Sequence, residues 1–251
     1  MDITEKIMIE IHCHLLPNID DGVTSFEESI QTISQMKQLG YEKIIITPHY
    51  IHGTKYNCNN KEKLNLLDQL KNKLQKKEID VELYLGNEVF IDEDLSKHLD
   101  EEQICTINNS RYLFIELPRN DQIVKLNDII FGLKNKNITP ILAHPERYSF
   151  IKEDVSLLED LIHRGVLLQV NFESINGKYG KEAKKVAQYI FKNNLASFIG
   201  GDVHHENSLF FKDYEKTKKK IIKIIKEEKW NELINENPQK VIENKEIKVN
   251  L

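Results

Sequence analysis

The 251-residue sequence predicts one α/β domain, residues 1–251, built on a parallel sheet. Apolar runs of strand length recur along the chain, and a segment of helical periodicity follows almost every one. Continuously apolar strands are typical of parallel sheets that are buried on both faces. About seven such units follow one another without a linker rich in Pro, Gly or Ser. One closed or nearly closed barrel is therefore favoured over two smaller domains.

The predicted strands share apolar composition and short length. They cover residues 7–11, 43–47, 81–86, 112–117, 138–144 and 166–171, and a last strand begins the segment 196–205. The strand at 112–117 is expected to be the second arm of a hairpin.

The predicted helices cover residues 25–39, 61–77, 121–136, 153–164 and 181–193. Ser25 and Glu28 form a capping box at the first helix, and Gly40 is its expected stop. From about residue 211 to 243 the sequence predicts one long and one or two short helices. The lysine-rich part, 217–229, is expected to expose a charged face, with partner binding as the alternative.

Composition limits the classes of function. The chain is 40% hydrophobic and 30% charged, with a net charge of −5 and a pI near 6.0. This balance does not favour nucleic acid as a partner, because a phosphate backbone requires a basic surface. Cys13, Cys58 and Cys105 lack CxxC spacing, which indicates neither a disulfide framework nor a cysteine zinc site. With no signal-peptide pattern and no run of eighteen apolar residues, we expect a cytoplasmic protein without membrane insertion.

Imidazole and carboxylate side chains gather where the predicted strands end. His12 and His14 end the first strand and should share one face, with Cys13 on the other. The remaining members follow the first loop or the later strands: Asp20, Asp21, His49, Glu88, Glu116, His144, Asp202 and His204. The carboxyl ends of parallel strands form the mouth of a barrel, where catalytic groups are expected.

Each of these residues alone has an ordinary structural explanation. His49 could be a hydrogen-bonded structural histidine, and Glu116 could be a paired core carboxylate. Together, such groups would form a costly buried polar cluster unless a cation paired them. The set therefore predicts two or three divalent metal ions, and the absence of thiolates suits manganese, iron or zinc.

Several motifs together resemble the polymerase-and-histidinol-phosphatase (PHP) superfamily. They are HCHLLPNIDDG, TPHY, GNEVF, IELP, AHPERY and GDVH, spread over residues 8–205. DDG, AHPERY and QVNFESINGKYGKEAKK more narrowly resemble the bacterial protein-tyrosine phosphatases linked to capsule and exopolysaccharide synthesis. The resemblance implies a distorted (β/α)7 TIM-like barrel of the PHP type.

The resemblance also implies a trinuclear metal centre, with manganese expected and iron or zinc as alternatives. The three implied ligand sets are His12, His14, Glu88 and Asp202; Glu88, Glu116 and His144; and Asp21, His49 and His204. Asp20 is expected to support the loop or a ligand without binding metal itself.

Arg147, Asp202 and His204 are the catalytic residues that the resemblance implies. Substrate contacts are expected from Arg147, Asn171 and His205. A salt bridge from Arg147 to Glu146 or to another carboxylate is the alternative.

The chain departs from the family pattern near the last metal histidine. His205 stands where the family usually has asparagine, and no arginine follows within a few residues. Lys212 could supply only a point charge there. Gly201 replaces the usual serine before the aspartate.

The function implied is hydrolysis of protein phosphotyrosine by a metal-activated hydroxide, without a cysteine nucleophile. The expected partner is the tail of a bacterial tyrosine kinase that controls polysaccharide export. Histidinol phosphate or another small phosphoester is an alternative substrate. A kinase-docking scaffold with weak catalysis is an alternative of another class. The sequence carries no signature of an oligomeric state.

Overall fold

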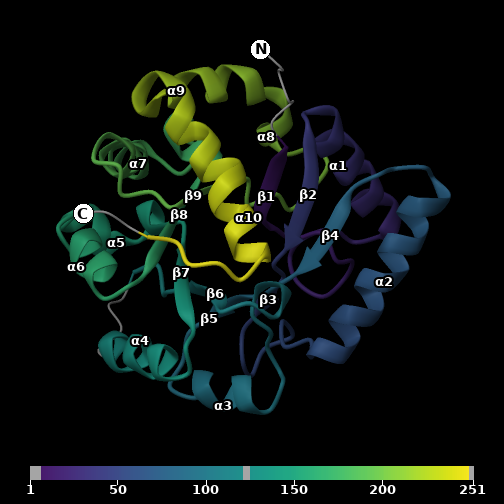
Figure 1. The fold of residues 1–251 in the computed structure, drawn as a ribbon, viewed down its shortest axis with the longest axis horizontal. Coiled ribbons are helices and arrows are strands. Elements are labelled where there is room, and N and C mark those ends of the chain that lie inside the picture. Colours follow the sequence, from purple (N-terminus) through teal and green to yellow (C-terminus); the bar gives the residue numbers. More distant parts are fainter. Residues whose placement is uncertain (1–6, 121–124, 249–251) are drawn as a thin grey trace.

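Parallel strands lie at the centre of the computed structural model, and helices surround them (Figure 1). The structure describes residues 7–120 and 125–248. One sheet has the strand order β1-β2-β4 and the other has the order β3-β5-β6-β7-β8-β9. Every strand pair in both sheets is parallel. The predicted α/β class with parallel strands is confirmed.

The strands follow the predicted apolar runs closely. They are β1 (Met8–Cys13), β2 (Tyr41–Ile46), β3 (His49–Tyr50), β4 (Glu82–Leu85), β5 (Glu88–Phe90), β6 (Tyr112–Glu116), β7 (Thr139–Ala143), β8 (Leu167–Asn171) and β9 (Phe198–Gly200). Two short strands, β3 and β5, were not predicted as separate elements.

Most of the helices lie between strands in the chain, and the last three follow β9. They are α1 (Phe26–Gln38), α2 (Asn60–Lys76), α3 (Leu95–Asp100), α4 (Leu126–Asn135), α5 (Ser149–Glu153), α6 (Leu157–His163), α7 (Lys181–Lys192), α8 (Leu209–Lys212), α9 (Tyr214–Asn231) and α10 (Asn237–Ile242). At α1 the Ser25 hydroxyl accepts the Glu28 N–H at 3.1 Å, as predicted. The Glu28 carboxylate instead accepts the Thr24 N–H at 2.8 Å, one residue before the capping-box position.

The predicted hairpin ending at 112–117 is wrong. β5 and β6 pair in parallel, with Glu88 opposite Phe114. Parallel neighbours need a crossover, and α3 provides it between them. The predicted helix at 153–164 corresponds to α6, and α5 precedes it as a separate short helix. Within the predicted helix 121–136, residues 121–124 lie outside the described residues, and α4 begins at Leu126.

The strand pairing of the first sheet continues into the second where the chain passes from β2 to β3 and from β4 to β5. Gly86 N–H donates to the Ile46 carbonyl at 2.9 Å, and Glu88 N–H donates to the Pro48 carbonyl at 3.1 Å. On the far side, Cys13 forms a parallel bridge with Val203. The strand ends of both sheets are thereby brought to one region.

Two apolar clusters pack the strands on opposite sides. The smaller, here called the inner cluster, includes Ile9, Ile45, Phe114 and Phe198 from both sheets. Val241 and Ile242 of α10 also belong to it. Figure 1 shows α10 lying across the middle of the strands. The larger cluster packs the helices against the outer faces of the strands.

The C-terminal segment wraps around the strands as two helical parts. Within α9, Lys226 has a non-helical backbone (φ 67°, ψ 167°), which divides the predicted long helix. Ile221 and Ile225 of α9 are buried. Among the helices that the structure describes, none has both the length and the apolar composition needed to cross a membrane. The three cysteine thiols are unpaired.

Candidate metal centre

A β-bulge in β1 directs the first two histidines inward. Glu10 lies opposite Ile44 and Cys13 opposite Ile46, so two residues of β1, Ile11 and His12, face the single residue between those partners. A bulge of this kind shifts the alternation of side chains by one position. His12 therefore follows Ile11 into the space of the inner cluster, where its ring lies 5.0 Å from Phe114. Cys13 joins the outer cluster.

The other ligand candidates reach the same space by strand alternation or by strained turns. Phe114 belongs to the inner cluster, and Glu116 two residues later keeps that orientation. His144 (φ 35°) and Asp202 (φ 50°) directly follow strand regions in the left-handed conformation. Such a backbone is costly for a residue other than glycine and is concentrated at functional sites.

The nine predicted ligands meet at the strand ends. Glu88 is at their centre: its Oε2 lies 3.2 Å from His12 Nε2 and 3.3 Å from His14 Nε2, and its Oε1 lies 2.9 Å from His144 Nε2. The candidate ligands form three groups, and within each group the donor atoms all lie within 4.8 Å of one another. The groups are His14, Asp21, His49 and His204; His12, His14 and Asp202; and His49, Glu88 and Glu116.

These groups resemble the expected ligand sets with three differences. His14 also joins Asp21, His49 and His204, and Glu88 is absent from the group of His12, His14 and Asp202. His49 joins Glu88 and Glu116, where His144 was expected. His144 Nε2 nevertheless lies 3.7 Å from Glu116 Oε1. His14 lies close to two of the three groups. The assignment of each residue to an individual metal remains a prediction.

The two neighbouring aspartates have different surroundings. Asp20 Oδ2 lies 2.8 Å from His14 Nδ1 and accepts the His49 N–H at 3.0 Å, so it orients two candidate ligands from behind. Asp21 is half exposed, and its Oδ1 lies 3.5 Å from both His49 Nε2 and His204 Nε2. Asp21 thus faces two of the other candidate ligands, and its role as a ligand remains a prediction.

Close contact shifts the protonation of the cluster. Burial opposes charge on His12, but Glu88 and Asp202 outweigh it and raise the His12 pKa to about 9. Burial, with the charge of Glu88, raises the pKa of Glu116 to about 8. Burial lowers the pKa of His144 to about 4. Carboxylates and imidazoles thus share protons at positions where divalent cations could supply the positive charge.

The donor set fits divalent metal ions. Glu88 Oε2 and His49 Nδ1 are buried and face each other at 3.1 Å, yet neither has a hydrogen-bond partner among the described residues. His12 Nε2 and His14 Nε2 lie 3.3 Å apart. Ring nitrogens and carboxylate oxygens that converge without satisfying one another are suited to a shared cation.

A pocket of about 530 Å³ opens over this cluster and carries basic groups on its wall. Arg147 lines the pocket, and its Nη1 donates to Asp202 Oδ2 at 2.9 Å. The alternative partner Glu146 instead accepts the Asn171 N–H at 3.0 Å and the Ser174 hydroxyl. The Arg147 guanidinium also lies 4.6 Å from the centre of the Tyr179 ring.

The other residues predicted to contact substrate lie in different places. His205 lines the pocket and is half exposed, with Nδ1 3.1 Å from Glu28 Oε1. Asn171 is fully buried behind the pocket, and its amide donates to Asp202 Oδ2 at 2.8 Å. This position differs from the predicted substrate contact. Lys212 is not one of the residues that line the pocket.

Sequence reasoning missed several residues around the site. Gln169 Oε1 lies 2.8 Å from His12 Nδ1, and Gln169 Nε2 donates to Asn171 Oδ1 at 2.9 Å. A polar residue two positions before Asn171 in an apolar strand was the available signal. Arg119, Lys178 and Tyr179 line the pocket, but they lie in loops without a periodic pattern.

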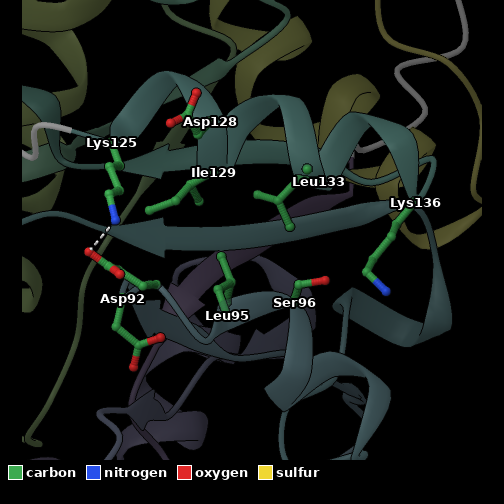
Figure 2. A pocket seen from close by; sticks show the side chains of 10 residues that line it. Asp92, Leu95, Ser96, Lys125, Asp128, Ile129, Leu133 and Lys136 are labelled. Atoms are coloured by element: carbon green, nitrogen blue, oxygen red, sulfur yellow. Dashed lines mark hydrogen bonds and ion pairs between the residues drawn. The ribbon is translucent and has the colours of Figure 1, made fainter.

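A second, smaller cleft of about 240 Å³ lies between α3 and α4. Figure 2 shows Leu95, Ile129 and Leu133 pointing into it, with Lys125 and Lys136 at its two ends. Both lysines form ion pairs, Lys125 with Glu93 and Lys136 with Asp100. The described residues of this cleft include none of the imidazole groups that mark the first pocket.

Fold and site together define the class: a parallel α/β protein whose strand ends carry a candidate centre for divalent metals. The chain belongs to the CpsB/CapC family of capsular polysaccharide synthesis, whose family model matches residues 8–243. It is 35% identical over 197 residues to CapC of Staphylococcus aureus, covering 78% of this chain and 77% of CapC. It is 31% identical over 208 residues to the tyrosine-protein phosphatase YwqE of Bacillus subtilis, covering 83% and 82%.

Solved structures extend the comparison. The structure superposes, with a TM-score of 0.87 and 28% sequence identity, on one of the crystal structures of YwqE from Bacillus subtilis and CpsB from Streptococcus pneumoniae. Those two proteins are described as metal-dependent tyrosine phosphatases. The match covers 96% of both chains. Histidinol phosphate phosphatase from Lactococcus lactis matches with a TM-score of 0.54 and 13% identity, over 85% of this chain and 93% of that one, which shows the shared fold alone.

Proposed function

We propose that this protein is a metal-dependent phosphatase that hydrolyses phosphotyrosine in proteins. The observation that carries the proposal is the convergence of nine imidazole and carboxylate groups below a pocket that Arg147 lines. Family membership and the names of the relatives support the same activity. The proposed partner is the tail of a bacterial tyrosine kinase of capsule or exopolysaccharide synthesis.

The proposed cofactor is two or three divalent metals, manganese first, with iron or zinc as alternatives. The proposed ligands are His12, His14, Asp21, His49, Glu88, Glu116, His144, Asp202 and His204. Bound in this centre, such metals would activate water as a nucleophile and offset charge on a phosphoryl group. We further propose that residues 1–251 form one domain. In it, β2 with β3 and β4 with β5 each count as one interrupted strand of a (β/α)7 barrel.

The side chains of the pocket have distinct tasks in this proposal. Arg147 binds the phosphoryl oxygens, because its guanidinium is charged and offers several donors in fixed geometry. Asn171 and Gln169 hold Asp202 and His12 in place through buried hydrogen bonds. His205 lines the mouth and contacts the substrate chain.

No thiol takes part in the proposed reaction. Burial raises the Cys13 pKa well above its ordinary value, which makes this thiol a poor nucleophile. Cys13 also lies on the outer side of β1, away from the pocket. A tyrosyl leaving group has a pKa near 10, so it requires less protonation than an alkoxide.

A parallel phosphate-release assay tests the proposal. Phosphotyrosine peptide, phosphoserine peptide and histidinol phosphate are each supplied to protein loaded with manganese, zinc or iron. We expect release from phosphotyrosine peptide to be fastest. Folded, metal-loaded protein that releases no phosphate from that peptide would refute the proposal.

Elemental analysis separates the enzyme from the scaffold alternative. The enzyme should hold two to three metals per chain, and His144→Ala or Asp202→Ala should lose metal and activity together. A folded protein that holds no metal and only binds the kinase would favour the scaffold.

A further inference from the structure

Glu10 is a buried carboxylate that belongs to none of the ligand groups. It lies on β1 two residues before His12 and is only 1% exposed. Its register partner Ile44 packs in the larger, outer cluster. Glu10 therefore lies behind the strand and does not line the pocket over the metal ligands.

One oxygen of this carboxylate binds two separate parts of the chain. Glu10 Oε1 accepts the His12 N–H at 2.9 Å and the Gly201 N–H at 2.9 Å. His12 lies in the β-bulge, where a backbone group loses its place in the strand ladder. Gly201 directly precedes Asp202, which has the strained left-handed backbone. Both contacts thus fall next to irregular backbone that carries a candidate ligand.

Further hydrogen bonds show that these two segments form one unit. Asp202 N–H donates to the His12 carbonyl at 2.9 Å, and His14 N–H donates to the Val203 carbonyl at 2.9 Å. A Cβ atom at Gly201 would lie 2.9 Å from Glu10 Oε2 and 2.8 Å from Val203 Cγ2. Because glycine has no Cβ atom, the Glu10 carboxylate can pack directly against the backbone at this position.

We propose that Glu10 is a positioning residue of the metal centre, which holds the bulge of β1 and the turn before Asp202 in one arrangement. Without this shared acceptor, two buried N–H groups lose their partner. The bulge and the turn can then relax, and His12, His14 and Asp202 no longer converge. The inference rests on the proposed metal-binding function, and it assigns a role to a residue outside the ligand set.

Manganese affinity of the full-length protein tests this role directly. Glu10→Met keeps a side chain of similar length and removes the acceptor, whereas Glu10→Gln keeps an oxygen that can accept both N–H groups. We expect the Kd for manganese, measured by calorimetry, to rise about 10- to 100-fold in Glu10→Met. Glu10→Gln should stay within about threefold of the unmodified protein, because its acceptor remains.

Leu74→Ala is the matched control, because Leu74 is buried on α2 and outside the centre. It should lower the unfolding temperature without changing the manganese Kd of the folded protein. If Glu10→Met fails to fold, Glu10→Asp replaces it, since the shorter carboxylate cannot reach both N–H groups.

The outcomes separate this inference from the proposed function. An unchanged Kd in folded Glu10→Met, or an equal loss in Glu10→Gln, would overturn the positioning role while the unmodified protein still binds metal. Failure of the unmodified protein to bind any metal would overturn the proposed function itself.

Discussion

Arg147 donates to Asp202, with its Nη1 2.9 Å from Asp202 Oδ2. The proposed phosphate-binding arginine thus contacts a proposed metal ligand. Asn171 donates to the same Oδ2 at 2.8 Å. Asp202 is therefore held by two donors, and the neighbouring imidazoles of His12, His144 and His204 help to keep its pKa below the ordinary value against the effect of burial.

Arg147→Lys should lower kcat/KM for a phosphotyrosine peptide by about tenfold or more. A lysine keeps the charge but cannot reproduce the planar, multi-donor contact with phosphoryl oxygens. Steady-state kinetics with manganese-loaded protein measure the effect, and elemental analysis should show unchanged metal content. Lys212→Met removes a cation that does not line the pocket and should leave kcat/KM unchanged. Equal activity in Arg147→Lys would contradict the assigned role.

Tyr179 supports Arg147 through its ring. Tyr179→Phe keeps that ring and should change kcat/KM by no more than about twofold. Tyr179→Ala removes it and should cost about 0.5–2 kcal/mol of transition-state binding, or roughly two- to thirtyfold in kcat/KM. Kinetics of the two variants side by side measure the ring's contribution. An equal loss of kcat/KM in Tyr179→Phe and Tyr179→Ala would show that the hydroxyl matters and the ring does not.

Asp20 and Asp21 should differ in the number of metals lost. Asp21→Asn removes a proposed ligand and should reduce the metal content by about one ion per chain at saturating manganese. Asp20→Asn leaves the ligands in place but weakens the support of His14, so the Kd should rise about tenfold with unchanged stoichiometry. Elemental analysis with titration calorimetry distinguishes the two. The reverse pattern would make Asp20 the ligand.

Metal-free protein should lose stability as the pH rises from about 6.5 to 9. The folded-state pKa of His12 is raised to about 9, so its stabilising effect is complete below pH 6.5 and disappears as the pH passes 9. Glu116, with its pKa raised to about 8, acts in the same direction. The pKa of His144 is lowered to about 4, so its opposite contribution is complete by pH 6.5. We expect a decrease of about 2 kcal/mol in the free energy of unfolding.

Urea unfolding at both pH values, with chelator and with manganese, measures this change. Manganese should abolish the decrease, because deprotonated ligands bind metal more tightly. Leu74→Ala removes no titratable group and should not change the pH dependence. A rise in metal-free stability toward pH 9 would show that the cluster does not hold the protons assigned to it.

Most of the candidate ligands could be predicted from sequence because they lie at or just beyond the ends of apolar runs, and Asp21 follows in the loop after the first run. Glu116 reaches the site by simple alternation along a buried strand. His49 and Glu88 lie on the short strands β3 and β5, which were not predicted as separate elements. His144 and Asp202, which lie on irregular backbone, were predicted from their residue types at the ends of apolar runs. The bulge that turns His12 inward and the left-handed backbone of His144 depend on tertiary contacts that no local pattern encodes.

The wrong hairpin and the missed pocket residues have a common physical cause. Residues 91–111 contain short, weakly periodic elements, and only pairing with β6 decides whether the chain reverses or crosses over. Arg119, Lys178 and Tyr179 reach the pocket from loops whose course is set by what they pack against.

The bridge between Cys13 and Val203 joins residues from the first and last fifths of the chain. Further along the chain, α10 contributes Val241 and Ile242 to the inner cluster. During synthesis, His12 and His14 leave the ribosome long before Asp202 and His204 exist. The centre therefore cannot assemble piece by piece on the nascent chain. Its formation has to wait for contacts of very large sequence separation, which are the slowest contacts for a folding protein to make.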